Sequence, residues 1–332
     1  MTEQNRKELE LEKREKALIL QSLQDLRPFF ETKEVTDIWV DNGNVSIKEF
    51  GKQRHDTGVY ISDQQCKNII IQIAKYNGIT IDRHNNPKLE TTIPHYFARI
   101  SALLEGWTKS PIIIIRKRPE TIFSLDDYVA NNSCSQQVAE KIKQYIKFKK
   151  NIIISGGTGT GKTTLANAIL KQMAEYTPND SFYIVEDTAE LQCTAKYAEM
   201  ICVPLELAQK AIDFSLRASP DRIIFGEVRT GGVLKALLDG WNTGHPGGFC
   251  TMHANSAAAT ILRMREKLFE DFGRVGPFKH LVDLIIHLAK VPGGIVIDEL
   301  IETRNYTEEE FTDLAEKAQK QESDKETKPS FN

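Results

Sequence analysis

The segment that most restricts the fold of this chain is the glycine-rich run 156–163, with the sequence GGTGTGKT. It matches the pattern G-x-x-x-x-G-K-[ST] in full. The apolar run 152–154 before it predicts a buried strand, and residues 165–173 after it predict a helix. Such a strand, loop and helix cradle phosphates with backbone N–H groups and the positive end of the helix. We therefore expect nucleotide binding here rather than an ordinary glycine-rich turn.

Two residues of this loop carry side chains that suit a nucleotide triphosphate. Lys162 is expected to bridge the β- and γ-phosphates, and Thr163 to ligate Mg²⁺. We expect no other lysine to take the place of Lys162.

Two acids are candidates for the groups that organise the metal and the attacking water. Glu186 follows the apolar run 182–185, and Glu227 follows the run 223–226. Ligands gather outside the carboxyl ends of strands in open α/β sheets, so both acids are expected to face the glycine-rich loop. Asp187 and Glu190 follow the first acid closely. The alternative is that these are solvated acids at loop ends.

His253 ends a further apolar run, 249–252, after a glycine-rich approach. From that position an imidazole could touch a γ-phosphate and report its loss. A lone histidine is more often structural, but the neighbouring phosphate loop favours the functional interpretation.

The length of 332 residues suggests two domains, and the net charge of −3 gives no strong sign of direct nucleic-acid binding. Five scattered cysteines without a CxxC pair fit a reducing compartment, and neither a membrane-spanning run nor a signal peptide is recognisable. We expect a protein that stays inside the cell.

The pattern along the chain predicts five parts. Residues 1–26 form a charged helix with five acids and five bases between Glu3 and Lys16, which favours a solvated helix or coiled coil over a membrane-surface helix. Residues 27–118 form an α+β domain that contains a hairpin around 35–47. Residues 119–132 are a linker. Residues 133–304 alternate helix and strand, which predicts an α/β domain with a mostly parallel sheet. Residues 305–332 are expected to be an acidic, disordered tail.

Four stretches taken in order resemble the secretion-ATPase superfamily, the hexameric traffic ATPases of type II and type IV secretion. They are GGTGTGKTT (Walker A), IVEDTAELQC (Asp box), PDRIIFGEVR (Walker B) and GHPGGFCTMHANSA (His box). SLDDYV and ELQC make the chain most similar to the conjugative-transfer, TrbB-like branch. The resemblance is dense over 123–264, thinner upstream, and absent from the first and last thirty residues or so.

The resemblance implies a RecA-like P-loop ATPase domain behind a smaller α+β N-terminal domain, and a role for each motif. Lys162, Glu186, Glu227 and His253 are implied as catalytic: Glu186 polarises the attacking water, Glu227 acts on the metal side with Thr163, and His253 senses the γ-phosphate. Two arginines of the N-terminal domain, Arg99 and Arg116, are implied near the phosphates, although Arg116 could equally cap an exposed strand end. The residues implied to bind Mg–ATP are Gly157, Thr158, Gly159, Thr160, Gly161, Lys162, Thr163, Thr164, Arg99 and Arg116.

One position departs from the family pattern. The family commonly has a second arginine just before the PDRI stretch, whereas this chain has Ser219. Only Arg217 and Arg222 then remain available for contacts between subunits.

The function that the resemblance implies is Mg-dependent ATP hydrolysis by a homohexameric ring that powers type IV secretion or conjugative DNA transfer and apparatus assembly. Its implied partners are inner-membrane apparatus proteins and a coupling protein, with a cytoplasmic location and peripheral membrane association through them. A RecA-type DNA-handling ATPase and a nucleotide-gated scaffold with little turnover remain as alternatives. The first would need a basic channel or stacking aromatics.

Overall fold

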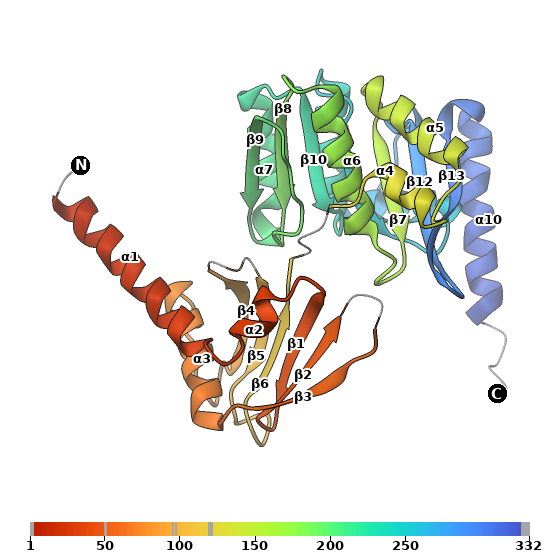
Figure 1. Cartoon of the computed structure of the whole chain (residues 1–332). Coiled ribbons are helices and arrows are strands. Elements are labelled where there is room, and N and C mark those ends of the chain that lie inside the picture. The colour runs from red at the N-terminus through yellow and green to blue at the C-terminus, as the bar shows by residue number, and fades with distance from the viewer. Residues whose placement is uncertain (1–2, 50–51, 95, 97, 119–121, 327–332) are drawn as a thin grey trace. The chain divides into compact units, whose positions relative to one another are not determined.

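The computed structural model describes residues 3–49, 52–94, 96, 98–118 and 122–326 (Figure 1). The chain divides into two compact units, Met1–Thr121 and Ile122–Asn332. The expected α/β architecture behind a smaller α+β domain is confirmed.

The first unit is built on an antiparallel sheet with the strand order β3-β2-β1-β6-β5-β4. The Asn42-Gly43 turn, with φ values of 48° and 76°, closes the expected hairpin between β1 and β2. Helix α3 begins with a capping box between Ser62 and Gln65. Its elements are α1 Glu3–Ser22, α2 Arg27–Glu31, β1 Val35–Asp41, β2 Asn44–Glu49, β3 His55–Tyr60, α3 Asp63–Tyr76, β4 Lys88–Ile93, β5 Ala98–Leu103 and β6 Ile112–Arg116.

The N-terminal helix is more than a solvated extension of this unit. The Tyr76 hydroxyl of α3 donates to Glu12 of α1 at 3.2 Å, and Lys75 pairs with Glu15 at 3.3 Å. Near its end, Ile19 is buried in the core of the unit together with Leu23. The second half of α1 therefore belongs to the first domain, because Ile19 lies in its core and Glu15 pairs with α3.

The second unit is built on a seven-stranded sheet with the order β13-β12-β7-β11-β10-β8-β9. All neighbours are parallel except β13, which runs antiparallel to β12. Its elements are α4 Leu125–Ala130, α5 Gln136–Lys147, β7 Ile152–Gly156, α6 Lys162–Tyr176, β8 Ser181–Glu186, β9 Tyr197–Cys202, α7 Leu205–Ala218, β10 Arg222–Glu227, α8 Gly231–Asn242, β11 Phe249–His253, α9 Ala257–Phe272, β12 Leu284–Val291, β13 Gly294–Glu302 and α10 Glu308–Glu326, with two short 3₁₀ turns at Lys279–Leu281 and Thr303–Asn305.

Two apolar cores cover the two faces of this sheet. Helices α4, α5 and α6 pack against Ile152 and Ile154 on one face, and helices α7 to α10 pack on the other face, which holds Ile153. Successive residues of one strand thus serve opposite layers, as expected for a sheet with helices on both sides. The carboxyl ends of β7, β8, β10 and β11 consequently meet at one edge of the sheet.

Two sequence-based boundaries are wrong. The expected linker 119–132 contains helix α4, whose Leu125 is buried in the second unit, while residues 119–121 lie outside the described residues. The expected disordered tail contains α10, whose Phe311, Ala315 and Ala318 are buried. Their spacing places them on one face of a helix, and the acidic composition concealed that face. Residues 327–332 lie outside the described residues.

Candidate active site

The glycine-rich loop joins β7, in the interior of the sheet, to the first turn of α6. Gly161 precedes α6 with φ 77°, a left-handed conformation that favours glycine. The hydroxyl of Thr160 closes the loop by donating to the Gly157 carbonyl at 2.9 Å. The loop therefore has the strand, the turn and the helix N-terminus that a phosphate-binding site requires.

Lys162 is held by the loop itself. Its Nζ donates to the carbonyls of Gly156 and Gly157 at 3.0 Å each, and it lies 3.3 Å from Nδ1 of His253. Burial lowers the pKa of the Lys162 ammonium, while the carboxylates of Glu227 and Glu190 act in the opposite direction. The lysine is thus confined between the loop and the strand end that carries His253.

His253 and Glu227 lie at the ends of neighbouring strands, β11 and β10, and their side chains meet. His253 Nε2 is 2.8 Å from Glu227 Oε1. An ammonium nitrogen can only donate, so Nδ1 of His253 accepts from Lys162 and the ring proton resides on Nε2. Burial lowers the pKa of His253, and the positive charges of Lys162 and Arg229 lower it further, against the influence of Glu227. Burial and these positive charges favour the neutral ring that the two contacts require.

Arg229 is a residue of this site that the sequence analysis missed. Its Nε and Nη2 donate to Glu227 Oε2 at 2.9 and 2.6 Å, and its Nη1 donates to Asp187 at 2.6 Å. One guanidinium therefore joins the acid of the Walker B stretch to the Asp box. Its position two residues after Glu227 was the only available signal, and it gave no indication of Asp187, which is distant in sequence.

Glu186 is buried, with 4% of its surface exposed, and its carboxylate organises the loop that follows β8. Its Oε2 accepts from the backbone N–H groups of Glu190 and Leu191 at 2.9 and 3.0 Å. Glu190 in turn accepts from the Thr163 hydroxyl at 3.0 Å. Glu190, which was assigned no role from the sequence, is therefore the acid that contacts Thr163, and Glu186 holds the backbone of Glu190.

A second lysine reaches the phosphate loop, at a different carbonyl from those that Lys162 contacts. Lys290, near the end of β12, donates to the Thr158 carbonyl at 3.0 Å. Lys290 and Thr158 are 132 residues apart in the sequence, so no local sequence pattern could predict their contact.

Arg99 and Arg116 lie in the first unit. They are opposite each other on β5 and β6, and Arg116 pairs with Asp37 at 3.0 Å, so it does hold a carboxylate at its strand end. Their part in nucleotide binding remains a prediction.

The expectation that Arg222 is available for contacts between subunits is wrong. Its side chain is fully buried, and it donates to Asp180 at 2.9 Å and to the Gly247 carbonyl at 2.6 Å. It stabilises the second unit through these hydrogen bonds, and its side chain has no exposed surface for contact with another subunit. Arg217 is exposed at the end of α7, and Ser219 follows it in a left-handed conformation with φ 49°.

Comparisons with known proteins place the chain in one family. The family described as "Type II/IV secretion system protein" matches residues 85–313. The conjugal transfer protein TrbB of Rhizobium radiobacter is 37% identical over 224 residues, which are 66% of this chain and 69% of TrbB. The type IV secretion system protein VirB11 of Bartonella quintana is 28% identical over 210 residues, 58% of this chain and 57% of VirB11.

Among solved structures, the Legionella pneumophila ATPase DotB resembles this chain with a TM-score of 0.62 at 20% identity, over 88% of this chain and 85% of DotB. That likeness establishes the fold, a RecA-like P-loop domain preceded by an N-terminal domain. The chain belongs to the type II/IV secretion system protein family. It is a nucleotide-binding P-loop ATPase, a traffic ATPase of the type IV secretion kind. Among the residues that the structure describes, no helix is long and apolar enough to cross a membrane.

Proposed function

We propose that the chain hydrolyses Mg–ATP at the glycine-rich loop and that, as a homohexameric ring, it powers conjugative DNA transfer or a related type IV secretion process. The observation that carries the proposal is the contact chain from Lys162 through His253 to Glu227, which joins the Walker A, His box and Walker B stretches at one sheet edge. A solvated acid or a merely structural histidine would not need this connection.

Each of the residues gathered at this sheet edge has a proposed task in the reaction. Lys162 and the loop N–H groups hold the β- and γ-phosphates. Glu186 orients the attacking water and accepts its proton. His253 detects the γ-phosphate by exchanging the contact of its Nε2–H with Glu227 for one with a phosphate oxygen. Arg229 keeps Glu227 and Asp187 at fixed positions during this exchange.

The oxygen ligands at this edge fit a magnesium ion. Thr163, with a hydroxyl, and Glu227, with a carboxylate, would hold the ion, and both are the hard oxygen donors that Mg²⁺ prefers. The ion supplies neutralisation of the charge on the β- and γ-phosphates. Glu190, which accepts from the Thr163 hydroxyl at 3.0 Å, offers a further carboxylate beside this ion.

For the ring, its partners and its location, the likeness to the family is the support for the proposal. We propose a hexamer in which Arg99 and Arg116 approach the phosphates, docked on inner-membrane apparatus proteins and a coupling protein at the cytoplasmic face. Five acids balance five bases between Glu3 and Lys16, so direct attraction of α1 to anionic lipid is expected to be weak. Membrane association through a protein partner is the corresponding proposal.

The experiment that tests the function is steady-state ATP hydrolysis with and without single-stranded DNA, with Lys162→Ala as the inactive control. A motor should hydrolyse ATP in the presence of Mg²⁺ at a rate that bare DNA does not change. Strong stimulation by DNA would favour a DNA-handling ATPase instead. Tight ATP binding with no turnover above that of Lys162→Ala would favour a nucleotide-gated scaffold.

A further inference from the structure

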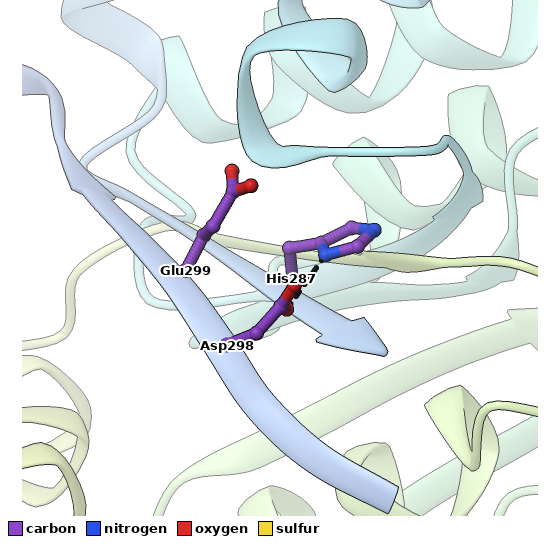
Figure 2. Close-up of side chains that lie close together, drawn as sticks. All are labelled: His287, Asp298 and Glu299. Carbon is purple, nitrogen blue, oxygen red and sulfur yellow. Dashed lines mark hydrogen bonds and ion pairs between the residues drawn. The ribbon is translucent and has the colours of Figure 1, made fainter. Parts of the chain in front are cut away.

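A second histidine, His287, lies behind the His box and is used by none of the steps above. It belongs to β12, and its side chain is buried, with 5% exposed. Its Nδ1 is 2.7 Å from Asp298 Oδ1, and its Nε2 is 3.3 Å from the carbonyl oxygen of Ala254 (Figure 2). Ala254 directly follows His253, so the His287 ring contacts the backbone next to the proposed γ-phosphate sensor.

The neighbouring strand β13 is irregular at this point. His287 pairs with Glu299 and Leu288 pairs with Ile297, which leaves Asp298 as an extra residue on β13. Such a bulge redirects side chains, and bulges are common beside active sites. Here it directs the Asp298 carboxylate to the His287 ring (Figure 2).

The Glu299 carboxylate contacts the far end of the segment 254–257, which joins β11 to α9. Its Oε2 accepts from the backbone N–H of Ala257, the first residue of α9, at 2.8 Å. The two adjacent acids of β13 thus act on both ends of the segment 254–257, one through His287 and one directly. This segment links His253 to α9, so its two ends are fixed by one bulged strand.

The trio of His287, Asp298 and Glu299 also has the ligand types of a metal site, with ligand atoms within 4.8 Å of one another. Its donor atoms, however, already have protein partners. Both ring nitrogens face an acceptor, and Glu299 accepts a backbone N–H. These hydrogen bonds account for the positions of all three side chains without a metal ion.

We propose that His287, oriented by Asp298, is a positioning residue that sets the His253 backbone for detection of the γ-phosphate. Ala254 O can only accept, so the His287 ring donates to it from Nε2. Loss of this contact would let the peptide between Ala254 and Asn255 rotate, and the backbone that leads back to His253 would move with it. His253 Nε2 and Nδ1 would then no longer both reach Glu227 and Lys162, which lie at 2.8 and 3.3 Å.

The inference rests on the proposed role of His253, so the experiment measures that role first. The readout is the ratio of the dissociation constants for ADP and a nonhydrolysable ATP analogue, determined on the full-length protein. Such a ratio reports γ-phosphate detection even where hydrolysis is lost. His253→Ala should reduce the preference for the analogue, and His287→Leu should reduce it about two- to tenfold, the range for one hydrogen bond.

The double variant His253→Ala/His287→Leu decides the question. If His287 acts through His253, the double variant should have the ratio of His253→Ala alone, because the second change has nothing left to disturb. His287→Gln, whose amide can still donate toward Ala254, should restore most of the preference if His287→Leu folds poorly. Glu299→Gln, which keeps an acceptor for Ala257, is the matched control and should leave the ratio unchanged.

Two results would overturn the inference, and they differ from a failure of the proposed function. An unchanged ratio in His287→Leu, or an equal further loss in the double variant, would show that His287 serves the fold and not the sensor. If His253→Ala itself leaves the ratio unchanged, the sensor role proposed for His253 is wrong and the role of His287 falls with it.

Discussion

His253 Nε2 lies 2.8 Å from Glu227 Oε1, so the side chains of the last residues of two neighbouring parallel strands are in direct contact. The other ring nitrogen of His253 faces the Lys162 ammonium at 3.3 Å. The imidazole is therefore a neutral connector between a cation and a carboxylate. A γ-phosphate arriving at Lys162 would compete for the same donors, which gives the histidine a means to sense it.

The first prediction concerns the titration of His253. Burial and the charges of Lys162 and Arg229 lower its pKa, so the midpoint should fall below the ordinary value of about 6.5. Hydrolysis that needs the neutral ring should persist as the pH falls through 6.5 and be lost only at the lower midpoint. NMR of the ring protons, assigned with a His253→Gln spectrum, measures it.

Substitutions of two charged neighbours of His253 should shift its pKa in opposite directions and serve as controls for this titration. Lys162→Met removes a positive charge and should raise the midpoint, whereas Glu227→Gln removes a negative charge and should lower it. A wild-type midpoint above 6.5, or shifts in the reverse directions, would mean that the ring does not lie between these two groups in solution.

The second prediction separates the two tasks of Glu186, which are water activation and support of the loop. Glu186→Gln keeps an oxygen that can accept from the N–H groups of Glu190 and Leu191. It should bind ATP within about threefold of the wild type and lose about 100-fold or more in kcat, as for a missing general base. Equilibrium binding and single-turnover hydrolysis measure the two effects.

The matched variant for this test is Glu186→Ala, which removes the acceptor as well. It should weaken ATP binding in addition to hydrolysis, because Glu190 and Thr163 lose their fixed relation. If Glu186→Gln also loses binding, Glu186 positions the metal, and Glu227 becomes the better candidate for the water.

The third prediction compares the two lysines of the phosphate loop. Lys162 is buried against the carbonyls of Gly156 and Gly157, whereas Lys290 meets the loop from its exposed side at Thr158. Lys162→Met should reduce kcat by about 100-fold or more, the cost of one preorganised electrostatic donor. Lys290→Met should cost less than about tenfold, since an exposed contact is weak. Comparable losses in the two variants would assign Lys290 a phosphate as well.

The sequence was sufficient for those parts of the site that depend on local pattern. The glycine-rich loop requires a strand and a helix on either side, and the carboxyl ends of parallel strands share one edge, so Glu186, Glu227 and His253 could be assigned to that edge in advance. What local pattern could not supply is the pairing of side chains across the edge. The contact of Arg229 with Asp187 and that of Thr163 with Glu190 depend on loop conformations.

The same limit explains the errors in the fold. Acidic composition favoured disorder beyond residue 304, but Phe311 finds a partner in Phe278, with the ring centroids 5.9 Å apart. That stabilisation depends on a surface formed by residues distant in sequence. The bulge at Asp298 likewise follows from the pairing of β12 with β13, and neither strand was assigned from the sequence.

The last prediction compares the contributions of Arg222 and Arg217 to stability. From the sequence, both arginines were assigned to contacts between subunits. Arg222 is fully buried between Asp180 and the Gly247 carbonyl, whereas Arg217 is exposed on α7. Removing one partner of a buried ion pair costs about 3–5 kcal/mol. Arg222→Ala should lie near the lower end of that range, because Lys149 still pairs with Asp180 at 2.9 Å.

Urea unfolding of the second unit measures this difference, with Trp241 as the fluorescent reporter. Trp241 is buried and donates to the Ile223 carbonyl at 3.0 Å, one residue along β10 from Arg222. Since the other tryptophans, Trp39 and Trp107, lie in the first unit, changing both to Phe leaves a signal from the second unit alone. Arg217→Ala should change the free energy of unfolding by less than about 0.5 kcal/mol, as is usual for surface substitutions. Equal losses in the two variants would contradict the assignment, whereas a loss of activity in Arg217→Ala at unchanged stability would make Arg217 the arginine that reaches a neighbouring subunit.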